Sequence, residues 1–254
     1  MDEVKYLSSE RKIDILCISE TWLLEDIPDK FIQIPNFNVF RHDKGRGGGT
    51  CIFVRDDLKV KQLCTGIENH PYIEDLWINV QYKKLPSFII GCIYRHPHAS
   101  VDSFNYLSDI FKYMCLQNKP IFILGDFNDD LFSAGNKLDK IFKNLKLRQL
   151  IDRPTRVTPN SKTLLDLAIT NRPEMIVFSD VIPGTIADHD LISIIIDFEK
   201  PKRQPLIRTF RSLKNYTQND FCNKLLKETS ILDYLLLTDN VDTQVDIFTK
   251  VFIV

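Results

Sequence analysis

The sequence has no long hydrophobic run and almost no net charge. No apolar stretch approaches the ~18 residues that a helix needs to cross a bilayer, and no apolar segment follows the polar N-terminus as it would in a signal peptide. The 33 basic and 34 acidic residues give a formal net charge of −1. This charge balance argues against a protein that binds nucleic acid non-specifically through a high net positive charge. It is compatible with a local basic rim around an acidic site. We therefore expect an intracellular protein of the nucleus or cytoplasm, with no membrane partner.

The sequence also lacks paired metal-binding cysteines. None of the six cysteines forms a C-x-x-C pair, and Cys17, Cys51 and Cys92 lie inside apolar runs. Cysteine in such a run behaves as a small hydrophobe. The pattern predicts a reducing compartment, with neither disulfides nor a zinc site.

Short apolar runs alternate with polar loops, without the regular strand–helix alternation of a Rossmann fold. Their periodicity predicts helices around 104–114 and 138–145, and strands at 13–19, 50–54, 76–82, 88–94, 121–124, 164–170, 178–182 and 191–198. The segment Gly45 to Gly49 lacks the GK[ST] ending of a P-loop, so we interpret it as a tight hairpin turn beside the substrate. These features favour a layered α/β sandwich with mixed or antiparallel sheets.

The character of the chain changes after Phe198. Residues 200–211 contain several basic residues, two prolines and no acid. We expect residues 1–199 to form one domain, residues 200–216 a basic linker, and residues 217–254 a connector of short helices. The apolar pattern continues to Val254 without a capping signal, as in a truncated chain.

Polar residues that suit a metal–phosphate site stand at the ends of several predicted strands. Asp126 and Asn128 follow the run 121–124. Either Asp126 caps a turn in which Asn128 is left-handed, or it accepts a proton from an attacking water that Asn128 helps to hold. Asp188 and His189 are either a solvated loop pair, or a metal-facing carboxylate and a histidine that stabilises the reacting phosphate.

Four further residues each have a structural and a functional interpretation. Glu20 is either solvated or a ligand of Mg²⁺, which prefers carboxylates. Tyr94 and Arg95 end a strand. Either their polar groups face solvent at the rim of the sheet, or they contact the scissile phosphate. Asp166 stands among apolar residues, and an unpaired buried carboxylate is costly. Asp166 is therefore either paired with a partner such as His189, or located on an edge strand where its carboxylate faces water.

In this order the motifs resemble the endonuclease/exonuclease/phosphatase superfamily, and most of all the apurinic-type endonuclease domain of non-LTR (LINE-type) retrotransposon polyproteins. The resemblance spans about residues 10–198 and rests on SETW at 19–22, YRHP at 94–97, GDFN at 125–128, LD at 165–166 and ADH at 187–189. It implies a four-layered α/β sandwich of two mixed sheets packed face to face, with helices outside. It also implies a hydrolase that uses Mg²⁺ or Mn²⁺ to nick DNA and leaves a 3′-hydroxyl to prime reverse transcription.

The resemblance implies roles by position. Glu20 would bind the metal, and Asp188 would serve the same metal site. Tyr94 would contact the phosphate, with Arg95 beside it.

The remaining roles concern the water and the transition state. Asp126 would orient and deprotonate the water, and Asn128 would aid in positioning it or a phosphate oxygen. Asp166 would orient His189, which would stabilise the transition state.

The sequence departs from this family at its start. The family begins with a strand that carries an asparagine of the site, whereas residues 1–12 contain no asparagine and no such strand. We therefore expect a monomeric fragment that lacks the first strand, with a reverse transcriptase domain downstream in the full polyprotein. Two alternatives stay open: a phosphatase or phosphodiesterase of the same superfamily acting on lipid or inositol phosphates, and a catalytically inactive remnant or partner-binding fragment.

Overall fold

The computed structural model describes residues 2–184, 187–197, 217–228, 233–235 and 237–252. The chain divides into two compact units, residues 1–202 and 203–254. The second unit contains α4 (Gln218–Glu228) and α5 (Val241–Phe252), where short helices were predicted. The predicted basic linker, residues 200–216, lies outside the described residues. Within the ranges given above, no helix has both the length and the apolar character of a membrane span.

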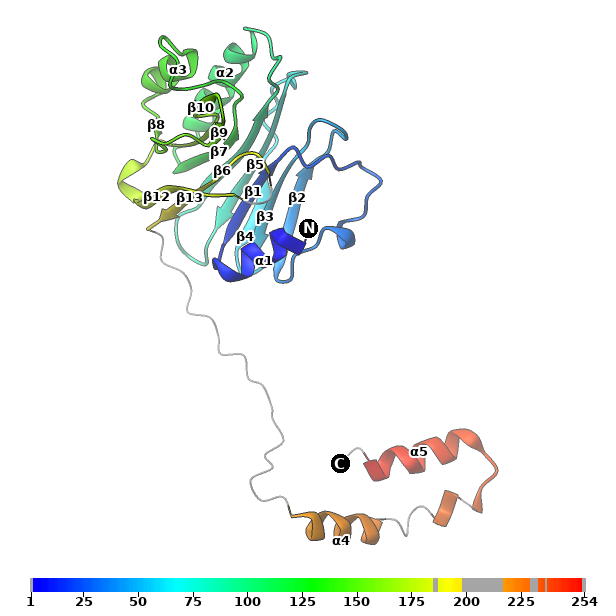
Figure 1. The fold of residues 1–254 in the computed structure, drawn as a ribbon. Helices are drawn as coiled ribbons and strands as arrows, with labels where there is room; N and C mark the ends of the chain where they lie inside the picture. Colours follow the sequence, from blue (N-terminus) through cyan, green and yellow to red (C-terminus); the bar gives the residue numbers. More distant parts are fainter. Residues whose placement is uncertain (1, 185–186, 198–216, 229–232, 236, 253–254) are drawn as a thin grey trace. The chain divides into compact units, whose positions relative to one another are not determined.

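The first unit contains a six-stranded sheet opposite a smaller layer of strands (Figure 1). The large sheet runs in the order β4 (Lys59–Gln62), β5 (Ile73–Gln81), β6 (Phe88–Arg95), β7 (Ile121–Asp126), β11 (Asp166–Thr170) and β8 (Arg148–Gln149). The smaller layer consists of β1 (Ile15–Ser19), β3 (Thr50–Arg55) and β2 (Phe37–His42), in that order, with a separate pair, β12 (Ile176–Ile182) and β13 (Leu191–Ile196).

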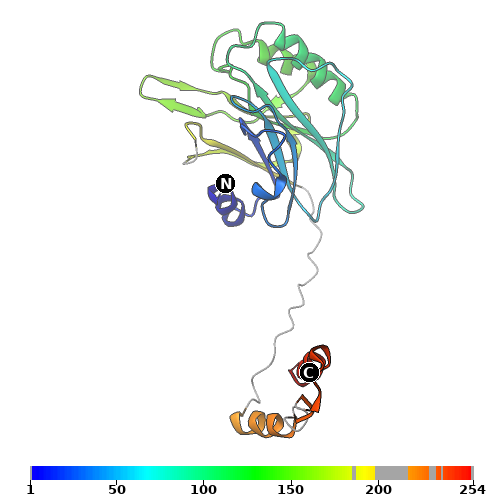
Figure 2. The ribbon, with the colours of Figure 1, turned by 90° about the vertical axis from the view of Figure 1, so that its right-hand side faces the viewer.

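Helices and short elements complete the unit. The chain begins with α1 (Asp2–Glu10), which occupies the segment in which no strand was predicted. The other elements are η1 (Asp29–Phe31), α2 (Ser103–Cys115), α3 (Lys137–Leu145), the hairpin of β9 (Arg156–Thr158) and β10 (Ser161–Thr163), and η2 (Pro173–Met175). Figures 1 and 2 show α2 and α3 on the outer side of the large sheet and α1 on the side of the smaller one.

Three hydrophobic clusters separate four layers. In the first, the rings of Phe111 in α2 and Trp77 in β5 pack edge to face at 6.4 Å. The second lies between the sheets and includes Val54 of β3 and Ile78 of β5. Phe53 points the opposite way from Val54, as neighbours on a strand do, and belongs to a third cluster that also includes a residue of α1. The predicted four-layered α/β sandwich is therefore confirmed.

One detail of that prediction is wrong. The resemblance implied two mixed sheets, but the only parallel pair among the described strands is β6 with β7, in the large sheet. The pairs of the smaller layer are antiparallel. The parallel pair has a functional consequence, because β6 and β7 end at the same edge of the sheet.

Gly125 makes the contact between β6 and β7 possible. Its φ is +148°, and a Cβ atom there would lie 1.9 Å from the carbonyl oxygen of Ile93. We expect Gly125→Ala to lower the free energy of unfolding by at least about 3 kcal/mol, because the strands would have to separate beside the candidate site.

Gly66→Ala is the matched control for this prediction. Gly66 also has a positive φ, +68°, but a Cβ atom added to it would meet no other atom within 4 Å. Alanine there should cost only about 1–2 kcal/mol. Urea unfolding of both variants measures the difference, and equal losses of stability would show that the close approach to Ile93 is unimportant.

Candidate active site at the sheet edge

The strand order of the large sheet brings three functional side chains to one edge. Asp126 ends β7 and pairs in register with Asp166, the first residue of β11. Tyr94 of β6 is the register partner of Asp126 on its other side. Asp166 therefore begins its strand instead of lying within it, as the pattern of 164–170 had suggested. Adjacent strands thus hold two carboxylates and a phenol side by side.

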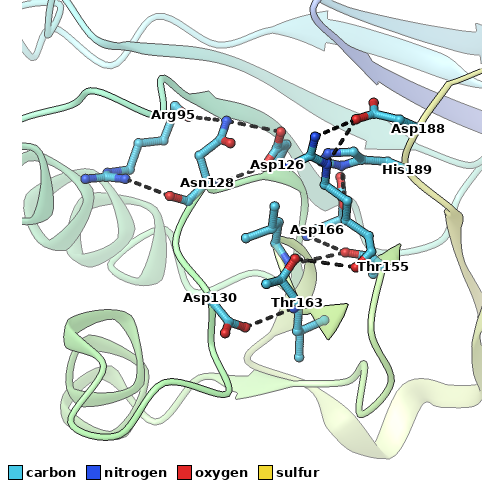
Figure 3. Close-up of polar contacts among 12 residues, drawn as sticks. Arg95, Asp126, Asn128, Asp130, Thr155, Thr163, Asp166, Asp188 and His189 are labelled. Atoms are coloured by element: carbon cyan, nitrogen blue, oxygen red, sulfur yellow. Dashed lines mark hydrogen bonds and ion pairs between the residues drawn. The ribbon is translucent and has the colours of Figure 1, made fainter. Parts of the chain in front are cut away.

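His189 completes this cluster from the loop before β13. Its Nδ1 donates to Oδ2 of Asp166 over 2.8 Å (Figure 3). One ligand atom from each of Asp126, Asp166 and His189 lies within 4.8 Å of the others. The predicted contact between Asp166 and His189 is present, and it explains how a partly buried carboxylate among apolar residues is accommodated.

Asn128 is tied to Asp126 by its backbone and by its side chain. Its backbone N–H donates to Oδ1 of Asp126 over 2.8 Å, and its Nδ2 donates to Oδ2 over 3.2 Å and to the carbonyl of Arg95 over 2.9 Å. The φ of Asn128 is 45°, so the turn-capping geometry considered from the sequence is present. The same contacts fix the Asp126 carboxylate at the edge of the sheet, so capping and participation in the site are compatible.

The cluster shifts the protonation of its members. Burial, reinforced by repulsion from the Asp166 carboxylate, raises the pKa of Asp126 to about 7. The hydrogen bond to Asp166 raises the pKa of His189 above its ordinary value. The site therefore combines a carboxyl group that titrates near neutrality with an imidazole that retains its proton to higher pH.

Tyr94 and Glu20 form the side of the site nearest the smaller sheet. Burial and a hydrogen bond with Glu20 raise the pKa of the Tyr94 phenol, so it remains a donor at neutral pH. Glu20 follows β1, and its charge adds to the repulsion that raises the pKa of Asp126. The SETW segment and the GDFN turn thus meet, although more than a hundred residues separate them.

Arg95, which was expected to contact the substrate phosphate, lies apart from the cluster of Asp126, Asp166 and His189. Arg95 is 5% exposed, and its guanidinium points away from Asp126 (Figure 3). It donates to Oγ of Ser103 and to the carbonyls of Ala99, Phe127 and Asn128, at 3.0–3.3 Å. Through these hydrogen bonds Arg95 stabilises the GDFN turn.

Asp188, which was expected to serve the metal site, forms an ion pair with an arginine. Its exposed carboxylate pairs with Arg156 of β9, with Nε at 2.9 Å and Nη2 at 2.8 Å. This hydrogen bond is the main reason why the pKa of Asp188 is lowered. Asp188, like Glu20, stands outside the group of Asp126, Asp166 and His189, the possible metal-binding cluster in the described part of the chain. It fastens the loop of His189 to the β9–β10 hairpin instead.

Thr155 is a supporting residue that the sequence did not reveal. Its buried Oγ1 accepts from the backbone N–H of Leu165 and of Asp166, at 3.1 and 3.0 Å. Its carbonyl accepts from the N–H of Asp190 over 2.7 Å. One residue thus sets both the start of β11 and the loop that carries His189. The sequence around Thr155, a single threonine after a proline, contains no pattern that predicts these contacts.

The donor set fits a divalent cation that prefers oxygen ligands. The negative charges of Asp166 and Glu20 both act on Asp126, and their repulsion raises its pKa. A cation among these carboxylates would relieve the repulsion, and carboxylate oxygens are the ligands that Mg²⁺ and Mn²⁺ favour. Glu20, Asp126 and Asp166 are the residues that would hold it.

Comparisons with known proteins identify the family and the fold of the chain. The endonuclease/exonuclease/phosphatase family matches residues 3–189. No curated protein matches the chain. Similar solved structures include the endonuclease domain of TRAS1, a telomere-specific non-LTR retrotransposon, with 19% identity and a TM-score of 0.58, covering 77% of this chain and 92% of that chain.

Two bacterial structures share the fold. One is an endonuclease/exonuclease/phosphatase family protein from Leptotrichia buccalis, with 16% identity and a TM-score of 0.60, covering 78% of this chain and 92% of that one. The other is the 3′ phosphatase NExo from Neisseria, bound to a product DNA hairpin, with 14% identity and a TM-score of 0.56, covering 78% of this chain and 94% of that one. The family match extends over most of the sequence and these structures show the same sandwich, so the chain belongs to the endonuclease/exonuclease/phosphatase family.

Proposed function

We propose that this chain is a DNA-nicking endonuclease that uses Mg²⁺ or Mn²⁺, and that it forms the endonuclease domain of a non-LTR retrotransposon polyprotein. Members of its family are hydrolases that act on phosphodiester bonds. The convergence of Asp126, Asp166 and His189 within 4.8 Å carries the proposal of an active centre. The similarity in fold to the TRAS1 domain supports the retrotransposon origin. A reverse transcriptase domain downstream and a monomeric state belong to the same proposal.

The residues of the chain supply the acid–base chemistry. Asp126 takes a proton from the water whose oxygen attacks phosphorus. Because Asn128 binds both carboxylate oxygens through its N–H groups, the base is fixed in orientation. The bond between phosphorus and the 3′ oxygen breaks, and the 3′ oxygen takes up a proton to become a hydroxyl.

Charge that develops on the phosphate meets two donors. His189, oriented by Asp166, presents its other ring nitrogen, and Tyr94, which is protonated at neutral pH, would turn its phenolic O–H from Glu20 to the phosphate. A bound divalent cation supplies further charge neutralisation at the phosphate. Glu20 lies where it would hold that cation together with the two aspartates.

Cleavage of a labelled oligonucleotide duplex tests this proposal. We expect nicks in the presence of Mg²⁺ and none in EDTA, with product ends that a DNA polymerase extends because they carry a 3′-hydroxyl. Hydrolysis of a small phosphomonoester in place of the duplex would favour the phosphatase alternative. Absence of both reactions from a folded protein would support the inactive fragment.

A further inference from the structure

The SETW segment adopts a strained backbone directly beside the site. Glu20 and Trp22 both have positive φ values, 53° and 55°. This region is unfavourable for residues with a Cβ atom, and most of all for a bulky one such as tryptophan. Strain of this kind persists only where the surrounding structure imposes it, and such strain gathers at functional sites.

The glycine-rich turn imposes this conformation. The N–H of Thr21 donates to the carbonyl of Gly49 over 3.2 Å, and the N–H of Trp22 donates to that of Gly48 over 2.9 Å. A Cβ atom on Gly49 would lie 2.4 Å from Oγ1 of Thr21, so only glycine permits this approach. The N–H of Gly49 in turn donates over 2.5 Å to Glu74, which is 2% exposed. A buried carboxylate thus anchors the turn that holds the SETW segment.

As a result, the indole ring of Trp22 is exposed to solvent. Trp22 is 53% exposed, whereas Trp77, the other tryptophan of the sequence, is 2% exposed. The indole Nε1 lies 3.4 Å from Oε2 of Glu20, so the ring stands next to a carboxylate of the candidate metal site. Core packing does not account for a strained tryptophan held in solvent, because burial is what stabilises a large apolar ring.

We propose that Trp22 stacks on a nucleobase next to the scissile phosphate. This inference rests on the proposed DNA-nicking function, because a phosphate at the site would bring its neighbouring nucleotides close to the indole. Each base has a π-face that an aromatic side chain can cover, whatever the sequence. The base must be unstacked, so an unpaired nucleotide beside the nicked bond should increase cleavage.

Tryptophan fluorescence tests this directly, since Trp22 is the exposed one of two tryptophans. The protein is titrated with a mixed-sequence single-stranded oligonucleotide in EDTA, so that no cleavage occurs. We expect quenching of the emission and protection from acrylamide. Trp22→Ala should remove both signals and weaken binding by about tenfold, Trp22→Phe should retain most of the affinity, and Tyr113→Ala, an exposed aromatic on α2, should have no effect.

The outcomes separate this inference from the proposed function. A wild-type protein that nicks duplex DNA, combined with a Trp22→Ala variant that binds as tightly and melts at the same temperature, would overturn the stacking role alone. A wild-type protein that neither binds nor cleaves DNA would overturn both. A nick rate that rises with an unpaired nucleotide in the wild type but not in Trp22→Ala is the result that the inference predicts.

Discussion

Replacement of Asp126 with asparagine should abolish nicking and stabilise the metal-free protein above neutral pH. Asparagine has the same shape but no basic oxygen, so we expect a loss of activity of about 10²–10⁴-fold. The folded state raises the pKa of Asp126 to about 7. In the unfolded chain the group loses its proton near pH 4, roughly, so the wild-type protein loses stability as the pH rises from there through about 7. The variant has no such loss.

Thermal melts in EDTA at acidic and alkaline pH measure this difference. The melting temperature of Asp126→Asn should exceed that of the wild type by a margin that grows with pH. Asp152→Asn is a suitable control, because Asp152 is exposed. Added Mg²⁺ should stabilise the wild type more than Asp126→Asn, since a ligand that binds the folded state raises its stability. Full activity in Asp126→Asn, or a lower melting temperature at alkaline pH, would contradict these roles.

Asp166→Asn should shift the alkaline limb of the pH profile of cleavage to lower pH. The hydrogen bond from His189 to Asp166 raises the pKa of His189, so loss of the Asp166 charge moves this limb downward. We also expect a loss of activity of about 10²-fold or more, because the neutral amide no longer stabilises the protonated imidazole of His189.

Asp188→Asn is the matched control for this experiment. Asp188 is the sequence neighbour of His189, but its carboxylate pairs with Arg156. We expect activity within about tenfold of the wild type and a smaller shift of the alkaline limb, because its charge acts on His189 less than that of Asp166 does. A loss in Asp188→Asn as large as that in Asp166→Asn would support the expected role of Asp188 at the metal site. An unshifted alkaline limb in Asp166→Asn would contradict the coupling of Asp166 to His189.

The strand ends were predictable because apolar runs that stop at acids or amides indicate the edge of a sheet. Asp126 and Tyr94 lie at that edge as the sequence suggested. Arg95 is directed away from this edge because neighbouring residues of a strand point to opposite faces. Tyr94 reaches Glu20, and Arg95 therefore turns inward to the carbonyls of the GDFN turn.

Other features had no local signal in the sequence. The strands β2 and β4 were missed, because polar residues interrupt their apolar pattern. The ion pair of Asp188 with Arg156 joins the loop before β13 to strand β9, and only the tertiary fold brings them together. The same holds for Thr155, whose contacts are with backbone groups of residues 165, 166 and 190. Non-local contacts of this kind depend on the packing of the whole unit and not on spacing.

Nicking of supercoiled plasmid is the sharpest test of the proposed active centre, because a single cut anywhere converts the substrate to the relaxed form. The purified chain is incubated with plasmid in Mg²⁺ and in EDTA, beside His189→Ala. We expect relaxed circles with Mg²⁺ alone, and a rate reduced by at least about 10²-fold in the variant. Relaxation that continues in EDTA, or that is as fast in His189→Ala as in the wild type, would show that this cluster of side chains is not the active centre.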